Sequence, residues 1–192
     1  IAAIGKHLRE MYGERSRHKV ASLPDQLFEV QLDHTIGNST TAMFGTVVAD
    51  SGLVPFGFDF ARGNFVISGP RASGKTTTLR TIATSLSQKE NAPEIYIFTP
   101  RPNELSIIGT PNHVAVGTQA CEQQLDDLMN RFGQIEENDL PEVVFIIDDS
   151  EDMIEGTFAQ QMESFIRGMK QKLHIIAAGD PSAFLRSYSG WI

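Results

Sequence analysis

The chain has 192 residues, of which 41% are hydrophobic and 21% charged, a composition that fits one globular domain able to fold without disulfides. Its net charge of −8 at pH 7 argues against direct binding of a nucleic-acid backbone, because such surfaces need a basic stripe. The sequence contains neither a run of 18 apolar residues nor a signal-peptide pattern, so we expect no membrane contact from this segment.

The single cysteine and the first residue add two expectations about context. Cys121 cannot form a disulfide within the chain, which indicates a reducing, cytoplasmic setting. The sequence begins with Ile1 and not with Met, so we expect a piece of a longer polypeptide. Any membrane attachment would then lie in the rest of that polypeptide.

Residues 1–54 are predicted to form a lead-in that packs on the core. Residues 1 to about 20 read as an amphipathic helix, and the basic stretch KHLREMYGERSRHK within them is typical of a solvated helix face. The following residues read as strands interrupted by Gly, Pro and Asn. The core itself is expected from residue 55 to residue 192.

From Asn64 the pattern changes to short apolar strands that alternate with helices. Apolar residues recur at helical spacing between the strands, as in Leu79, Ile82, Ala83 and Leu86, and the methionines among them fit core positions. This alternation predicts an α/β fold with a mainly parallel sheet flanked by helices, and places the chemistry at the strand ends. The predicted strands are NFVIS, EIYIFT, HVAVG, VVFIID and LHIIAAG.

A phosphate-binding motif follows the first of these strands. Residues 69–76 read GPRASGKT, which matches G-x-x-x-x-G-K-[ST] between a predicted strand and a predicted helix. Glycines let backbone N–H groups approach phosphates closely, and the helix N-terminus adds partial positive charge. Lys75 would reach the β and γ phosphates, and the Thr76 hydroxyl would bind Mg²⁺. We therefore predict ATP and Mg²⁺ as cofactors, with the nucleotide-binding residues Gly69, Pro70, Arg71, Ala72, Ser73, Gly74, Lys75, Thr76 and Thr77.

The strand VVFIID ends in a pair of acidic residues. Asp148 would hold the Mg²⁺ shell together with Thr76. Asp149 is the candidate catalytic residue, at a position that ring-forming motors usually fill with Glu to orient the attacking water. Because Asp is one methylene shorter, its oxygens would lie about 1–1.5 Å further from that water, a displacement that can cost on the order of 100-fold in rate. The residues after it, Ser150 to Asp152, read as a solvent-exposed loop.

From about Pro55 to the end, the sequence resembles the FtsK/SpoIIIE family of RecA-like ATPases. The resemblance is carried by the blocks VPFGFDFARGNFVISGPRASGKTTTLRTIA, IFTPRPNEL, VVFIIDDSED and KLHIIAAGDPSAF. The lead-in also resembles the approach to the repeated ATPase domains of the EccC/EssC proteins of type VII secretion. This resemblance implies a RecA-like P-loop core, neighbouring ATPase modules of the same chain or ring as partners, and attachment to the inner face of the cell membrane through the rest of the chain.

Three positions depart from the DNA-translocating branch of that family. Where a DNA translocase would resemble hDPKxxEL, this chain has Thr99 in place of the Asp and Arg101 in place of the Lys. Where a translocase would resemble ATQRPS, this chain has Gly179 in place of the glutamine. The resemblance places that glutamine near the γ-phosphate or its water, and a glycine has no donor to offer a transition state. Together with Asp149, these departures predict ATP binding with slow or absent hydrolysis.

Three functions therefore remain open on sequence grounds. The first is a Mg-ATP-binding module of a type VII secretion ATPase, with a structural or regulatory role or a groove for helical secreted proteins. The second is an active DNA translocase motor, against which the acidic charge, Thr99 and Gly179 argue. The third is an interaction scaffold that binds no nucleotide.

Overall fold

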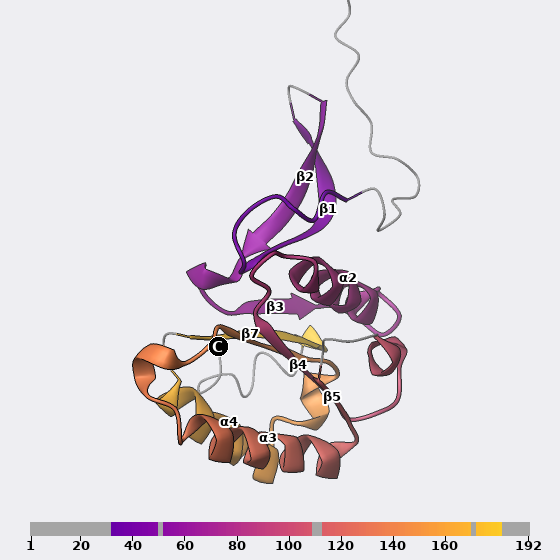
Figure 1. Cartoon of the computed structure of the whole chain (residues 1–192). Coiled ribbons are helices and arrows are strands. Elements are labelled where there is room, and N and C mark those ends of the chain that lie inside the picture. The colour runs from indigo at the N-terminus through magenta and orange to yellow at the C-terminus, as the bar shows by residue number, and fades with distance from the viewer. Residues whose placement is uncertain (1–31, 50–51, 109–112, 170–171, 182–192) are drawn as a thin grey trace, which may run out of the picture.

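The computed structural model describes residues 32–49, 52–108, 113–169 and 172–181 (Figure 1). At its centre is a five-stranded sheet in the order β3-β7-β6-β4-β5, in which every neighbouring pair is parallel. Its members are β3 (Phe65–Ser68), β4 (Glu94–Thr99), β5 (His113–Val116), β6 (Val143–Ile147) and β7 (Leu173–Gly179). All five predicted strands are confirmed, each within one residue at either end.

The interior strands are buried on both faces, which explains their continuous apolar runs. Every residue of β6 and β7 is buried, and so is every residue of β4 after Glu94. In the register, Phe145 of β6 lies between Tyr96 of β4 and Ile175 of β7. His174 is a buried residue of β7, and its Nε2 lies 2.7 Å from Glu142 Oε2.

Helices cover both faces of the sheet, as predicted. Figure 1 shows α3 (Thr118–Phe132) and α4 (Thr157–Gly168) on one face and α2 (Lys75–Ser87) on the other. Short 3-10 helices connect these elements, and they are η2 (Phe60–Arg62), η3 (Glu104–Ile107), η4 (Glu137–Asp139) and η5 (Ser150–Asp152). None of the helices described is both long and apolar enough to span a bilayer.

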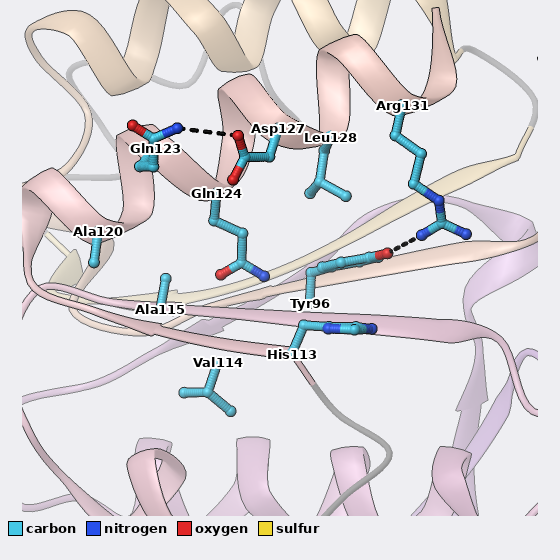
Figure 2. A pocket seen from close by; sticks show the side chains of 10 residues that line it. All are labelled: Tyr96, His113, Val114, Ala115, Ala120, Gln123, Gln124, Asp127, Leu128 and Arg131. Atoms are coloured by element: carbon cyan, nitrogen blue, oxygen red, sulfur yellow. Dashed lines mark hydrogen bonds between the residues drawn. The ribbon is translucent and has the colours of Figure 1, made fainter. Parts of the chain in front are cut away.

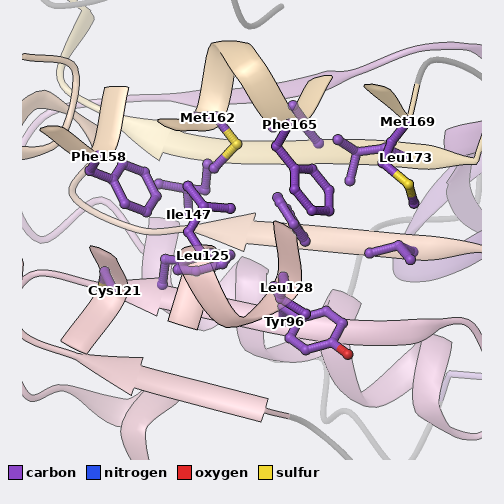
Figure 3. Packing of buried hydrophobic residues seen from close by; sticks show 14 of the residues in the cluster. Tyr96, Cys121, Leu125, Leu128, Ile147, Phe158, Met162, Phe165, Met169 and Leu173 are labelled. Carbon is purple, nitrogen blue, oxygen red and sulfur yellow. The ribbon is translucent and has the colours of Figure 1, made fainter. Parts of the chain in front are cut away.

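Each face of the sheet has its own hydrophobic core. The core under α3 and α4 contains Phe145 and three buried methionines, Met153, Met162 and Met169. Figure 3 shows Met162 and Met169 beside Phe158 and Phe165. The prediction that methionines fill core positions is confirmed for Met162 and Met169. The second core, under α2, contains the predicted helix positions Leu79, Ile82, Ala83 and Leu86.

An antiparallel hairpin, β1 (Thr41–Ala49) and β2 (Gly52–Asp59), projects from the α2 side of the sheet (Figure 1). Its base is attached to α2 by a hydrogen bond of 2.9 Å from Met43 N to Ser85 Oγ. It is attached to β3 by packing of the Phe58 ring on the Phe65 ring. The expected boundary between lead-in and core, at residues 54 and 55, falls inside β2. The helix predicted for residues 1–20 lies outside the described residues.

The prediction of a solvent-exposed loop after Asp149 is wrong for Ser150, which is completely buried, whereas Asp152 is exposed. Residues 150–152 form the 3-10 helix η5. Glu151 and Asp152 also have defined contacts, since Glu151 Oε2 accepts a hydrogen bond from Asp180 N at 3.2 Å and Asp152 is paired with Arg101. The acidic run turns back onto the sheet because Asp149 adopts a left-handed backbone conformation, which the sequence pattern does not reveal.

Candidate nucleotide-binding site

The predicted phosphate loop lies between β3 and α2, at the carboxyl end of the sheet. Gly74 has φ 89° and is followed directly by Lys75, the first residue of α2, so a glycine is needed where the chain enters the helix. A Cβ at Gly69 would lie 2.6 Å from Ser73 Oγ, so a side chain at this position would require the Ser73 side chain to move. Gly69 N also donates to Gly179 O at 3.3 Å, and this contact joins the loop to the end of β7.

Lys75 extends back over this loop. Its Nζ donates to Gly69 O at 2.9 Å and to Pro70 O at 3.0 Å. The ammonium group therefore lies against two carbonyls of the loop that leads into α2, and the N-terminus of that helix adds positive charge through its dipole. This arrangement concentrates positive charge at one place and suits a bound phosphate chain.

Thr76 and Asp148 form the second half of the site. Thr76 Oγ1 donates to Asp148 Oδ2 at 2.7 Å, so a hydroxyl on α2 and a carboxylate at the end of β6 meet across the sheet edge. Asp148 is completely buried, and its Oδ1 has no hydrogen-bond partner. Burial raises the pKa of this carboxyl, with an added contribution from Asp149. A buried carboxylate with an unpaired oxygen beside a threonine hydroxyl fits the oxygen ligand set of Mg²⁺.

The described residues contain no cluster of three or more His, Cys, Asp or Glu side chains that could hold a metal by itself. Mg²⁺ is commonly held by one or two protein oxygens together with substrate phosphates and water. Thr76 and Asp148 match that mode of binding, in which the metal arrives with the nucleotide.

Asp149 lines a cleft of about 370 Å³ next to the phosphate loop. It is one of two non-glycine residues with positive φ among those described, at 45°, a conformation that Asp tolerates better than most residues. Its Oδ2 lies 3.3 Å from Arg101 Nη2. The cleft is lined by the cationic side chains of Arg71, Lys75 and Arg101, by Asp149, Glu151 and Asp180, and by Pro102 and Asn103.

Two residues that contact Asp148 or Asp149, Arg101 and Asn103, are not among the predicted site residues. Arg101 was noted only as a departure from a family pattern, and Asn103 was not singled out. Asn103 Nδ2 donates to Asp148 Oδ2 at 3.0 Å and to Thr99 Oγ1 at 2.9 Å, so it links the loop after β4 to the Mg²⁺ carboxylate. The available signal was the block FTPRPNEL, which contains the end of a predicted strand and the loop after it.

The other predicted residues lie around this centre. Arg71 lines the cleft, and Ala72 bends the loop with φ 61°. Thr77 is exposed on the first turn of α2, outside the lining of the cleft. Gly179 contributes its carbonyl to the contact with the loop.

A larger cavity, of about 530 Å³, lies elsewhere, between β5 and α3 (Figure 2). Its floor is the Tyr96 ring, which stacks on the His113 ring with 4.7 Å between the ring centroids. The Tyr96 hydroxyl accepts a hydrogen bond of 2.6 Å from Arg131 Nη1. None of the predicted phosphate or metal residues lines it. The smaller cleft is the better candidate because Lys75 of the phosphate loop lines it, and so does Asn103, which is hydrogen-bonded to Asp148.

Comparison with known proteins identifies relatives of this fold. A family profile described as AAA domain matches residues 58–186. A search of curated proteins by sequence gives no match.

Solved structures of type VII secretion ATPases share the fold. The Thermomonospora curvata EccC ATPases 2 and 3, in complex with a signal sequence peptide, are 20% identical with a TM-score of 0.69 over 98% of this chain and 38% of theirs. The cytoplasmic domain of EccC from the same organism is 19% identical, with a TM-score of 0.66 over 95% of this chain and 23% of its own. EssC ATPases 2 and 3 from Geobacillus thermodenitrificans are 16% identical, with a TM-score of 0.67 over 95% and 38%.

This chain therefore spans well under half the length of those three structures. The predicted resemblance to P-loop ATPases of the FtsK/SpoIIIE type, and to EccC and EssC domains in particular, is confirmed at the level of the fold. Since the profile match covers more than half of its residues, the chain belongs to the AAA domain family of ATPases.

Proposed function

We propose that this chain is a Mg-ATP-binding module of a type VII protein secretion motor and that it hydrolyses ATP slowly or not at all. The observation that carries the proposal is the 2.7 Å contact between Thr76 and Asp148, whose Oδ1 remains unpaired beside the phosphate loop. It brings two Mg²⁺ ligands from α2 and β6 to the place where Lys75 and the helix N-terminus attract phosphates.

In this proposal each residue has a distinct role in binding. The backbone N–H groups of the loop after Pro70 and the Lys75 ammonium hold the β and γ phosphates, and Thr76 and Asp148 hold Mg²⁺. Mg²⁺ held by these two residues would neutralise phosphate charge. Asn103 keeps the Asp148 carboxylate oriented through its hydrogen bond of 3.0 Å.

The positions that would serve turnover are less favourable. The Asp149 carboxylate is one methylene shorter than that of the Glu usual in motors, so its oxygens would lie about 1–1.5 Å further from an attacking water. Gly179 offers no side-chain donor at the end of β7. The loss of one preorganised donor typically costs about 100-fold or more in rate. These features support binding with little hydrolysis.

The proposed setting is a chain of ATPase modules attached to the inner face of the cell membrane. The structures of similar fold include EccC and EssC proteins with two ATPases, and one of these carries a signal sequence peptide. By analogy, we propose neighbouring ATPase modules as partners and helical segments of secreted proteins as candidate ligands. ATP would then act as a structural or regulatory ligand between modules.

Titration with Mg-ATP tests this function on the full chain, on Lys75→Ala and on the control Lys172→Ala. Lys172 is a partly exposed lysine paired with Glu142 at 3.5 Å. A ligand at 100 times its Kd stabilises by about 2.7 kcal/mol, which corresponds to a rise in Tm of roughly 5–10 °C for a chain of this size. We expect that rise in the wild type and in Lys172→Ala, and its loss in Lys75→Ala.

The same samples separate the competing functions. If ATP changes the Tm of none of the proteins, the chain is a scaffold that binds no nucleotide. If the wild type hydrolyses ATP at several per second, or if duplex DNA stimulates hydrolysis, the chain is an active translocase motor.

A further inference from the structure

Arg101 lies on the loop between β4 and η3, and its guanidinium group is held mainly by carboxylates. Its Nη2 lies 2.5 Å from Asp152 Oδ2 and 3.3 Å from Asp149 Oδ2, while 57% of its side chain is exposed. The same side chain lines the cleft that Arg71 and Lys75 line. Three cations therefore face one small volume beside the phosphate loop.

The backbone of this loop is fixed, whereas the side chain of Arg101 is not. Arg101 O accepts a hydrogen bond from Thr99 Oγ1 at 2.7 Å, and Thr99 Oγ1 accepts one from Asn103 Nδ2 at 2.9 Å. Asn103 in turn is bonded to Asp148. The backbone of Arg101 is thus connected to the Asp148 carboxylate through a series of hydrogen bonds. Rotation about the side-chain bonds of Arg101 is then enough to redirect the guanidinium.

The ion pairs of Arg101 are weak enough to be exchanged. The side chains of Asp149 and Asp152 are 31% and 46% exposed, and ion pairs between such partly exposed groups contribute little to stability. A phosphate group offers the guanidinium a bidentate partner of higher charge. A γ-phosphate bound beside Lys75 would compete with both carboxylates for Arg101.

We infer that Arg101 is a ligand of the γ-phosphate, which exchanges Asp149 and Asp152 for that phosphate and thereby makes the site distinguish ATP from ADP. This inference rests on the proposed function, because it requires the phosphate loop to hold the β-phosphate. The exchange also separates Asp149 from its cationic partner when ATP is bound.

Calorimetric titration of the full chain with Mg-ATP and with Mg-ADP tests the inference. Arg101→Gln should weaken ATP binding by about tenfold, the loss expected for one hydrogen bond to a charged group, and should change ADP binding less than about twofold because ADP lacks the γ-phosphate. Arg167→Gln is the matched control, because Arg167 is an exposed arginine paired with Glu163 on α4 at 3.5 Å. It should leave both affinities unchanged.

A variant of the competing carboxylate predicts an effect of opposite sign. Asp152→Asn removes the nearest partner of Arg101, so the ratio of ATP affinity to ADP affinity should rise. In the double variant with Arg101→Gln this rise should vanish, because the released side chain is no longer present. Should Arg101→Gln fail to fold, Arg101→Lys takes its place and should lose part of the ATP preference, since it keeps the charge without the bidentate geometry.

Several outcomes would overturn the inference. Equal losses for ATP and ADP in Arg101→Gln would mean that Arg101 only adds general positive charge. No loss for either nucleotide would mean that its ion pairs are purely structural. If the wild type and Lys75→Ala both bind no nucleotide, the proposed function itself fails, and this pattern is distinct from a selective effect at Arg101.

Discussion

Replacing Asp149 with Glu tests the chemical reason for slow hydrolysis. The substitution extends the side chain by one methylene and restores the residue that motors usually have at this position. It moves the carboxylate about 1–1.5 Å further into the cleft, and because displacements near 1 Å can change rates on the order of 100-fold, we expect turnover to rise by about 10–100-fold. The missing side chain at Gly179 should keep the rate below that of an efficient motor.

The same substitution should also reduce stability, since the backbone at residue 149 has φ 45° and ψ 45°. Left-handed backbone costs most residues about 1–2 kcal/mol, and Asp is among the exceptions that bond locally. Glu tolerates left-handed backbone less well than Asp, so the free energy of unfolding should fall by about 1 kcal/mol. For a chain of this size the corresponding fall in Tm is about 2–4 °C.

The assay pairs a sensitive phosphate-release measurement with thermal melting, on the wild type, on Asp149→Glu and on the control Asp127→Glu. Asp127 is an exposed residue of α3 that accepts a hydrogen bond from Gln123, so its variant makes the same chemical change outside the site. A variant that binds Mg-ATP as well as the wild type and still shows no faster turnover would refute the reasoning about reach. Rapid turnover by the wild type would refute it as well.

Further predictions concern three buried groups. Asp148→Asn should keep or raise the Tm measured without ligand, because burial raises the pKa of Asp148 and disfavours its charged form. The same variant should lose the Mg²⁺-dependent part of the rise in Tm that ATP causes. In the wild type that Mg²⁺-dependent part should disappear as the pH falls through the raised pKa of Asp148, above the range of an exposed Asp. Burial raises the pKa of the Cys121 thiol to about 11, so a thiol reagent at pH 8 should label it only after denaturation. Phe145→Ala should lower the free energy of unfolding by about 3–5 kcal/mol in urea titration, since its ring contacts those of Tyr96, Phe98 and Phe165 in the core.

The sequence pattern predicted the fold well because the sheet is buried on both faces. Each central strand must then be a continuous apolar run, and such runs stand out between helical patterns. The strand β5 has only four residues, yet the turn residues around it marked its ends. The backbone conformation of Asp149 was not predictable, since no pattern distinguishes a left-handed Asp from an extended one.

The candidate site was predictable where one local motif determines it. The order of residues 69–76 places Lys75 and Thr76 at the start of a helix regardless of the rest of the chain. Arg101 and Asn103 depend instead on how the loop after β4 folds back toward β6. Asn103 is 45 positions from Asp148 in the sequence, and their hydrogen bond follows from the capping of η3, which the spacing of apolar residues does not encode.

The position of β7 has a consequence for the order of events during synthesis. The last strand described inserts between β3 and β6, the strands that lead into the phosphate loop and to Asp148. Until residues 173–179 have left the ribosome, both neighbours have an open edge, and the carbonyl of Gly179 that binds Gly69 is missing. A nascent or truncated chain would therefore bind nucleotide poorly and risk pairing with other chains. Nucleotide binding would report that the sheet has closed, and so would serve as a readout of completed folding.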